Sequence, residues 1–136
     1  MARILLVDDD ADVQHTLSKI LATGGHDVLL GRQGNQALED VERLSFDLLV
    51  TDVVMREVDG WRLIRALRTC KPGAAVIAIS GGAKALEPDV ALRLSAAFGA
   101  HGILRKPIRR DALLRMVADV LARRAEADPA SAPSPS

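Results

Sequence analysis

Five short apolar runs alternate along this chain with stretches whose apolar residues recur at helical spacing. The runs are residues 3–7, 27–31, 47–51, 75–80 and 102–106. Three of them are almost continuously apolar, which is typical of parallel strands that helices cover on both faces. The stretches between and after them carry apolar stripes that include Leu17, Val41, Leu67, Leu94 and Val117. A strand followed by a helix, five times over, predicts right-handed crossovers and an α/β fold around a parallel sheet.

The length of the chain limits it to one domain. With 136 residues, of which 49% are hydrophobic, it can bury one core but not two of normal size. Residues 125–136 are rich in Pro, Ala and Ser and offer little apolar surface for burial. We therefore expect one domain over residues 1–124 and a disordered tail over residues 125–136.

Charge and composition argue against several classes of protein. The formal net charge is zero and aromatic residues make up 2% of the chain, so direct binding to nucleic acid is not expected. We see neither a signal peptide nor an apolar run of membrane-spanning length. A single cysteine, Cys70, suits a reducing compartment, and we expect a cytoplasmic protein. His15, His26 and His101 lack metal-ligand spacing, so we expect them to have structural or surface roles.

Polar residues gather at the ends of the expected strands. Asp8 and Asp9 follow the first strand, Asp52 follows the third, Ser80 closes the fourth and Lys106 closes the fifth. Ligands of open α/β sheets bind at the carboxyl ends of the strands, so these side chains should meet there. Two carboxylates about 4 Å apart repel by roughly 4 kcal/mol at an effective dielectric constant of 20. A hard divalent cation such as Mg²⁺ would remove that cost.

Two neighbouring residues have a simpler interpretation. Asp10 and Asp12 follow the acidic pair directly and precede the first helical stripe. A carboxylate at this position caps the helix N-terminus, and a second one in the first turn favours the helix dipole. We therefore expect these two aspartates to serve the helix rather than the ligand site.

The order of these motifs resembles the receiver domain of two-component response regulators, over residues 3 to about 122. The matching segments are "LLVDDD", "LLVTDVVM", "VIAISGG" and "GAHGILRKP", each at the end of an expected strand. The resemblance implies a doubly wound, flavodoxin-like (βα)5 fold with five parallel strands in the order 2-1-3-4-5. It also implies a phosphoprotein that takes part in signal transduction or a phosphorelay.

The resemblance assigns a role to each polar residue at the strand ends. Asp52 would accept a phosphoryl group from a phosphohistidine, in a reaction that depends on Mg²⁺. The metal ligands would be Asp8, Asp9, Asp52 and the backbone carbonyl of Val54, with Asp9 as the main direct ligand. Lys106 would pair with the phosphoryl oxygens.

Ser80 would act as the switch, because its hydroxyl would bind the phosphate and pull on the loop that follows the fourth strand. The phosphoryl donor would be a histidine kinase or a histidine phosphotransfer protein, and the output would go to a downstream protein target. We expect a stand-alone receiver without an effector domain. It would catalyse only its own phosphorylation and dephosphorylation.

Three departures from the family pattern bear on this expectation. Arg56 stands where many receivers have Pro, and Ile103 stands where many have an aromatic residue that reorients on activation. Val54 and Gly82 carry no polar side chain that could orient an attacking water. We therefore hypothesise that the acyl phosphate is long-lived.

Two alternatives stay open at this point. The chain could be a receiver-like interaction module that works without phosphorylation. It could also be a phosphatase of the haloacid dehalogenase type, since Asp8 and Asp10, and again Asp10 and Asp12, have Asp-x-Asp spacing. That second alternative would leave Asp52 unexplained.

Overall fold

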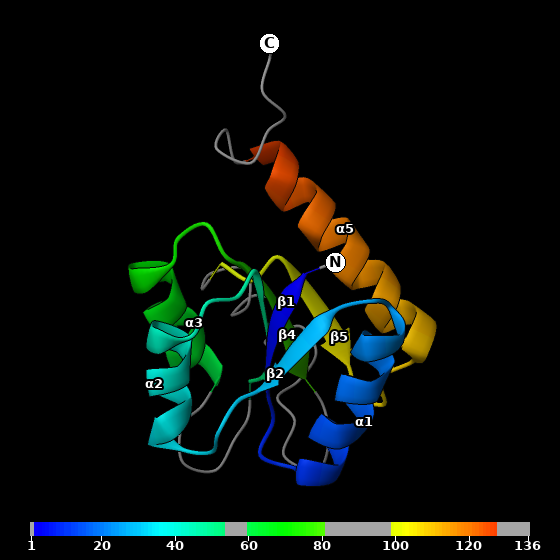
Figure 1. Ribbon diagram of the computed structural model, residues 1–136, viewed down its shortest axis with the longest axis horizontal. Coiled ribbons are helices and arrows are strands. Elements are labelled where there is room, and N and C mark those ends of the chain that lie inside the picture. Colours follow the sequence, from blue (N-terminus) through cyan, green and yellow to red (C-terminus); the bar gives the residue numbers. More distant parts are fainter. Residues whose placement is uncertain (1, 54–59, 81–98, 128–136) are drawn as a thin grey trace.

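The computed structural model of the chain contains one parallel sheet of five strands (Figure 1). The structure describes residues 2–53, 60–80 and 99–127. The strands are β1 (Arg3–Val7), β2 (Asp27–Leu30), β3 (Leu48–Asp52), β4 (Ala75–Ser80) and β5 (Gly102–Arg105). Their order across the sheet is β2-β1-β3-β4-β5, and every neighbouring pair is parallel. The predicted fold class and strand order are confirmed.

Helices cover both faces of this sheet. They are α1 (Ala11–Thr23), α2 (Asn35–Arg43), α3 (Gly60–Cys70) and α5 (Arg110–Ala127). In Figure 1, α2 and α3 lie on one side of the strands, and α1 and α5 lie on the other. No helix within the described ranges combines the length and the hydropathy that crossing a membrane requires. The predicted helical stripe around Leu94 falls outside the described residues.

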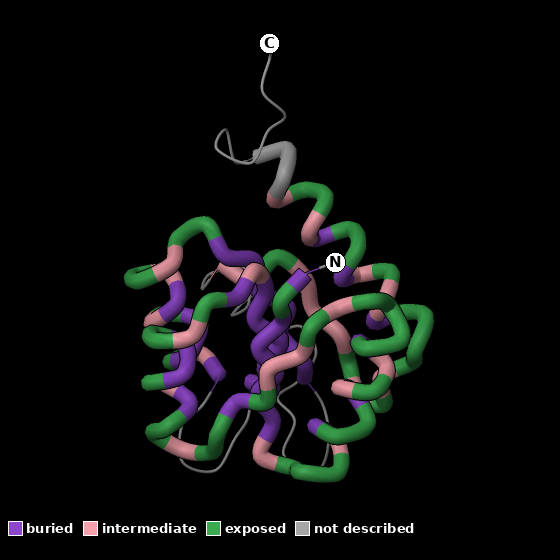
Figure 2. Tube along the Cα trace, in the orientation of Figure 1, coloured by how far each residue is buried: buried purple, intermediate pink, exposed green. Residues whose placement is uncertain are grey.

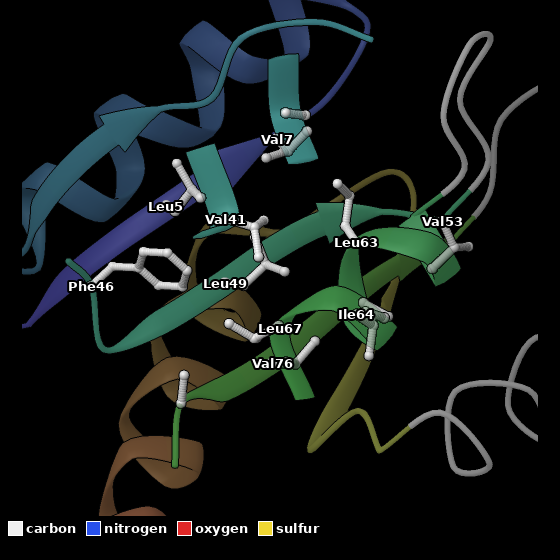
Figure 3. Packing of buried hydrophobic residues seen from close by; sticks show 13 residues of the cluster. Leu5, Val7, Val41, Phe46, Leu49, Val53, Leu63, Ile64, Leu67 and Val76 are labelled. Carbon is white, nitrogen blue, oxygen red and sulfur yellow. The ribbon is translucent and has the colours of Figure 1, made fainter. Parts of the chain in front are cut away.

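The core consists of two apolar layers, one on each face of the sheet. Side chains alternate along a strand, so Leu5 of β1 packs with the α2 and α3 layer while Ile4 packs with the α1 and α5 layer. Figure 3 shows the first layer, where Leu49 of β3 lies beside Val41 of α2 and Leu67 of α3. Burial of one such side chain stabilises the fold by about 1.5–3 kcal/mol.

Burial decreases from the centre of the sheet to its edges, as Figure 2 shows by colour. The strands β3 and β4 are buried along their whole length, whereas β2 and β5 contain no fully buried residue. Leu30, the last residue of β2, is 53% exposed. The near-continuous apolar runs therefore mark the strands that have a neighbour on each side.

The observed boundaries differ slightly from the expected ones. Asp52 is the last residue of β3 rather than the first residue after it, because it still pairs with Ile79 of β4. Lys106 lies one residue beyond the end of β5. Helix α5 continues to Ala127, while residues 128–136 lie outside the described residues, so the domain boundary and the disordered tail stay predictions.

The acidic segment after β1 leads directly into α1. Asp10 is the N-cap of this helix, and its side chain accepts hydrogen bonds from the backbone N–H groups of Asp12 (3.0 Å) and Val13 (3.3 Å). Asp12 lies in the first turn. The interpretation of these two aspartates as helix-capping residues is confirmed.

Candidate functional site

The strand order brings the polar strand ends together at one edge of the sheet. β1 and β3 are adjacent, with Val7 paired to Thr51, so Asp8 and Asp52 each lie one position further along neighbouring strands. In this strand order, the ligand site of the fold lies between β1 and β3, where the direction of winding reverses. Ser80 ends β4, and its carbonyl accepts a hydrogen bond from the Lys106 N–H (2.7 Å). We call this the carboxyl edge of the sheet.

Three carboxylates meet at the carboxyl edge. One oxygen each from Asp8, Asp9 and Asp52 lies within 4.8 Å of the others. Asp8 is fully buried and Asp52 is 3% exposed, whereas Asp9 is partly exposed. The sheet thus holds two acidic side chains out of water and a third at the rim.

Lys106 provides the positive charge at this edge. Its Nζ donates a hydrogen bond to Asp52 Oδ2 (2.8 Å) and lies 3.3 Å from Asp8 Oδ2. Burial alone would lower the pKa of this ammonium, but the hydrogen bond and charge of Asp52, together with the charge of Asp8, outweigh it and raise the pKa of Lys106. The side chain therefore stays protonated and is shared between two carboxylates.

The surroundings of Asp8 disfavour its charged form. Its Oδ1 accepts a hydrogen bond from the Asp10 N–H (2.9 Å), but its buried Oδ2 accepts none within the described parts of the chain. Burial raises the pKa of Asp8, and although the Asp10 N–H and Lys106 oppose this shift, the charge of Asp52 adds to it. A buried carboxylate oxygen beside two further carboxylates is a donor set that Mg²⁺ prefers, so these residues fit a hard divalent cation.

Gly60 sets how closely α3 approaches the site. It is the first residue of α3, and its N–H donates to the Val53 carbonyl (3.1 Å). A Cβ at this position would lie 2.2 Å from the backbone oxygen of Asp52 and 2.7 Å from the Cα of Val53. Only glycine fits against the backbone of Asp52. In the sequence, the Asp59-Gly60 pair indicates a turn and the entry to a helix, and α3 does begin at Gly60, but nothing in the sequence indicates this approach to Asp52.

Gln33 also contacts the site and was not expected to. Its side-chain amide donates a hydrogen bond to the backbone oxygen of Asp8 (2.9 Å). No motif in the sequence pointed to this contact, because it depends on the register between β1 and the loop that follows β2.

The structure thus brings together four of the expected site residues: Asp8, Asp9, Asp52 and Lys106. Ser80 is buried at the end of the strand next to β3. Ile103 is partly buried and packs against the α2 and α3 core layer. Val54, Arg56 and Gly82 lie outside the described residues, so the expectations attached to them stay predictions.

Comparisons with known proteins agree on one family. A family model described as the response regulator receiver domain matches residues 4–118. The chain is 40% identical over 90 residues to the response regulator receiver protein CpdR of Brucella abortus, covering 65% of this chain and 75% of that protein. It is 36% identical over 108 residues to a response regulator receiver protein of Anaeromyxobacter sp., covering 79% of this chain. The chain spans 44% of that relative's length, and 28% of the transcriptional regulatory protein GlrR of Escherichia coli.

Solved structures agree with this result. A receiver domain protein described as CheY-like, from Methanospirillum hungatei, superposes with a TM-score of 0.82 at 26% identity, covering 94% of this chain and 99% of that one. A receiver domain protein from Clostridium thermocellum gives a TM-score of 0.81 at 25% identity. Neither comparison supports the phosphatase alternative. With the carboxyl edge built as the motifs require, the chain belongs to the family of response regulator receiver domains of two-component signalling.

Proposed function

We propose that Asp52 is the phosphoacceptor of this receiver domain. The observation that carries the proposal is the contact of its buried carboxylate with Lys106 (2.8 Å) beside the acidic pair. Receiver domains generally depend on Mg²⁺, and we propose Asp8, Asp9, Asp52 and the backbone carbonyl of Val54 as its ligands. The ion, when bound, would offset the negative charge of the carboxylates and of the incoming phosphoryl group.

In the proposed reaction, Asp52 attacks the phosphorus of a phosphohistidine. An O–P bond to the carboxylate forms, the N–P bond to the donor breaks, and the electron pair returns to the imidazole nitrogen of the donor. Phosphoryl transfer mainly requires positioning and neutralisation of charge. Lys106 supports both, because it holds Asp52 in place before the reaction and can pair with a phosphoryl oxygen afterwards.

Ser80 is the proposed link from the site to the rest of the molecule. Its hydroxyl would donate a hydrogen bond to the phosphoryl group and so shift the segment that begins at residue 81. Because Ile103 replaces the aromatic residue of many receivers, an aromatic swing at that position does not contribute. The shifted surface would be recognised by a downstream protein.

The partners follow from the same chemistry. The donor would be a histidine kinase or a histidine phosphotransfer protein, and the chain would catalyse only its own phosphorylation and dephosphorylation. Such donors present their phosphohistidine in the cytoplasm, where we propose that this protein acts. A partner protein would carry the output.

The direct test is incubation of the purified chain with Mg²⁺ and acetyl phosphate, followed by intact-mass spectrometry. We expect the mass of one phosphoryl group to be added to the wild type and to be absent from Asp52→Asn. Asp119→Asn, which alters an exposed carboxylate on α5, is the matched control and should be labelled normally. Labelling of Asp52→Asn, or no labelling of the wild type with Mg²⁺ present, would contradict the proposal.

A further inference from the structure

The hydrogen bonds between β1 and β2 continue past the end of β2 by means of a side chain. In this parallel ladder, alternate N–H groups on the β2 side donate to the carbonyl 25 positions earlier, as Asp27 does with Ala2 (2.9 Å) and Gly31 with Leu6 (2.8 Å). The next bond of the series would join residue 33 to Asp8. The side-chain amide of Gln33 makes it instead, with Nε2 at 2.9 Å from the Asp8 oxygen.

The loop that carries Gln33 is held against β1 at its first residue. Gly31 approaches β1 so closely that a Cβ there would lie 2.6 Å from a methyl group of Val7. Gln14, buried on α1, donates hydrogen bonds from its side chain to the backbone oxygens of both Leu6 (3.0 Å) and Gly31 (3.0 Å). The start of the loop therefore has a fixed distance from the end of β1.

A second anchor holds the loop to α2. The backbone N–H of Arg32 donates to Asp40 Oδ2 (2.7 Å), and the guanidinium of Arg32 binds Asp40 Oδ1 through Nη2 (2.7 Å) and Nε (2.9 Å). Asp40 is buried, so this end of the contact is fixed by the packing of α2. Gln33 directly follows this clamp and precedes α2, so its backbone has little freedom.

We propose that Gln33 is a positioning residue for the acidic pair, and that its amide sets the affinity of the carboxyl edge for Mg²⁺. The peptide between Asp8 and Asp9 is planar, so a hydrogen bond that fixes the Asp8 carbonyl also fixes the direction of the Asp9 N–H and the place of its Cα. Both aspartates contribute to the cluster with Asp52. The proposal rests on the proposed function, since it concerns the same metal site.

The test replaces Gln33 by methionine, which has a similar length and no hydrogen-bond donor. Loss of contacts that orient metal ligands commonly reduces metal affinity by about 10- to 100-fold. Because Gln33 is exposed, we expect a value near the lower limit, about a tenfold rise in the Kd for Mg²⁺ measured by calorimetry. The matched control is Gln36→Met, an exposed glutamine on α2, which should leave the Kd unchanged.

Two further measurements separate positioning from a general structural role. In the metal-free protein, Gln33→Met should shift the NMR amide signal of Asp9 but leave the unfolding temperature close to that of the wild type. At saturating Mg²⁺, the rate of Asp52 labelling by acetyl phosphate should return to the wild-type value. An unchanged Kd, or a large fall in metal-free unfolding temperature together with a lower saturated rate, would overturn the proposal.

The outcomes for the two proposals are distinguishable. Wild-type binding of Mg²⁺ with an equal Kd for Gln33→Met would overturn only the role of Gln33. A raised Kd without labelling of Asp52 would overturn the phosphoacceptor and leave the positioning role standing. If the wild type does not bind Mg²⁺, both fail.

Discussion

The two ends of the sheet pair their polar groups in opposite ways. At the amino edge, where the strands begin, cations bind backbone carbonyls. Arg68 donates to the carbonyls of Pro72 (3.1 Å), Ala74 (3.2 Å) and Gly99 (2.7 Å), and Arg124 donates to that of Gly73 (2.6 Å). At the carboxyl edge, three carboxylates lie close together and the Lys106 ammonium pairs with two of them, Asp8 and Asp52.

Two histidines at the amino edge accept hydrogen bonds from backbone N–H groups in their neutral form. His26 Nδ1 accepts a hydrogen bond from the Ala2 N–H (3.2 Å), and His101 Nδ1 accepts one from the Val76 N–H (3.0 Å). Burial lowers the pKa of both imidazoles, and nearby arginines, first of all Arg68, lower that of His101 further. Each histidine precedes an edge strand and joins it to the inner strand beside it. The structural role expected of these two histidines is confirmed.

The difference between the edges separates a structural arrangement from a ligand site. Arg68 Nε at the amino edge also has no hydrogen-bond partner among the described residues, but the two terminal nitrogens of the same guanidinium bind three carbonyls. Asp8 Oδ2 has only the ion pair with Lys106 (3.3 Å), and burial, to which the charge of Asp52 adds, raises the pKa of Asp8 and so opposes the folded state. At the amino edge the polar groups are bonded by the chain itself, whereas the carboxyl edge holds a set of carboxylates that fits a hard divalent cation.

The largest loss of stability is expected at Gly60, where α3 packs directly against the backbone of Asp52. Gly60→Ala would drive a Cβ into the backbone of Asp52, so we expect a loss of about 3 kcal/mol or more in the free energy of unfolding. In Gly73→Ala, at the amino edge, the added Cβ meets no atom of the described residues within 4 Å, so this variant should be neutral or slightly stabilising. Urea unfolding of both variants tests this contrast, and equal stabilities would contradict it.

Removal of a lysine should be more harmful at the carboxyl edge than at the amino edge. Lys106→Met leaves Asp8 and Asp52 buried without their shared cation, and we expect it to destabilise the metal-free chain by about 2 kcal/mol. Lys71→Met removes hydrogen bonds to the carbonyls of Val41 (2.6 Å) and Glu42 (2.9 Å) and should cost about 1 kcal/mol.

Magnesium provides the second half of that comparison. It should narrow the stability difference between Lys106→Met and the wild type, because it offsets the same carboxylates, and it should leave the difference between Lys71→Met and the wild type unchanged. Denaturant midpoints with and without Mg²⁺ measure the difference. An equal narrowing of both differences from the wild type would show that the ion does not act at the carboxyl edge.

Neutralising Asp8 should stabilise the metal-free protein. Its pKa is raised in the folded state, so its ionisation opposes folding above that pKa, and this cost disappears as the pH falls toward 3.8. We expect Asp8→Asn to gain about 1 kcal/mol at neutral pH, and less in acid. Asp10→Asn keeps the helix cap and should change stability little, so a similar gain in that variant would argue against burial as the cause.

The smallest effect on stability is expected from the titration of the histidines at the amino edge. Their pKa values are lowered in the folded state, so the stability that they contribute is present above the ordinary value of 6.5 and is lost as the pH falls through the lowered pKa. His101→Gln keeps an acceptor for the Val76 N–H without titrating, and should make stability less sensitive to acid. His15→Gln, on the exposed surface of α1, should leave the pH profile unchanged. Identical profiles for wild type and His101→Gln would contradict this reading.

The fold and most of the site could be predicted from the sequence because both follow from topology. Apolar runs without alternation require cover on both faces, and the sheet that results places Asp8, Asp52 and Lys106 at one edge. The contacts of Gln33 and Gly60 could not be predicted. The first depends on the register of β1 with β2, in which Leu6 pairs with Leu30, and the second on an approach of α3 to β3 that leaves no room for a Cβ. The sequence also treats Asp8 and Asp9 alike, whereas the sheet buries Asp8 completely and leaves Asp9 partly exposed.

The most direct test of the central claim is the thermal unfolding of the wild-type chain in increasing concentrations of Mg²⁺. If the carboxylates of the carboxyl edge are arranged for a cation, the Tm should rise with Mg²⁺ as binding to the folded state requires, and the rise should be lost in Asp8→Asn. A Tm that does not respond to Mg²⁺, or that rises equally in Asp8→Asn, would contradict the account.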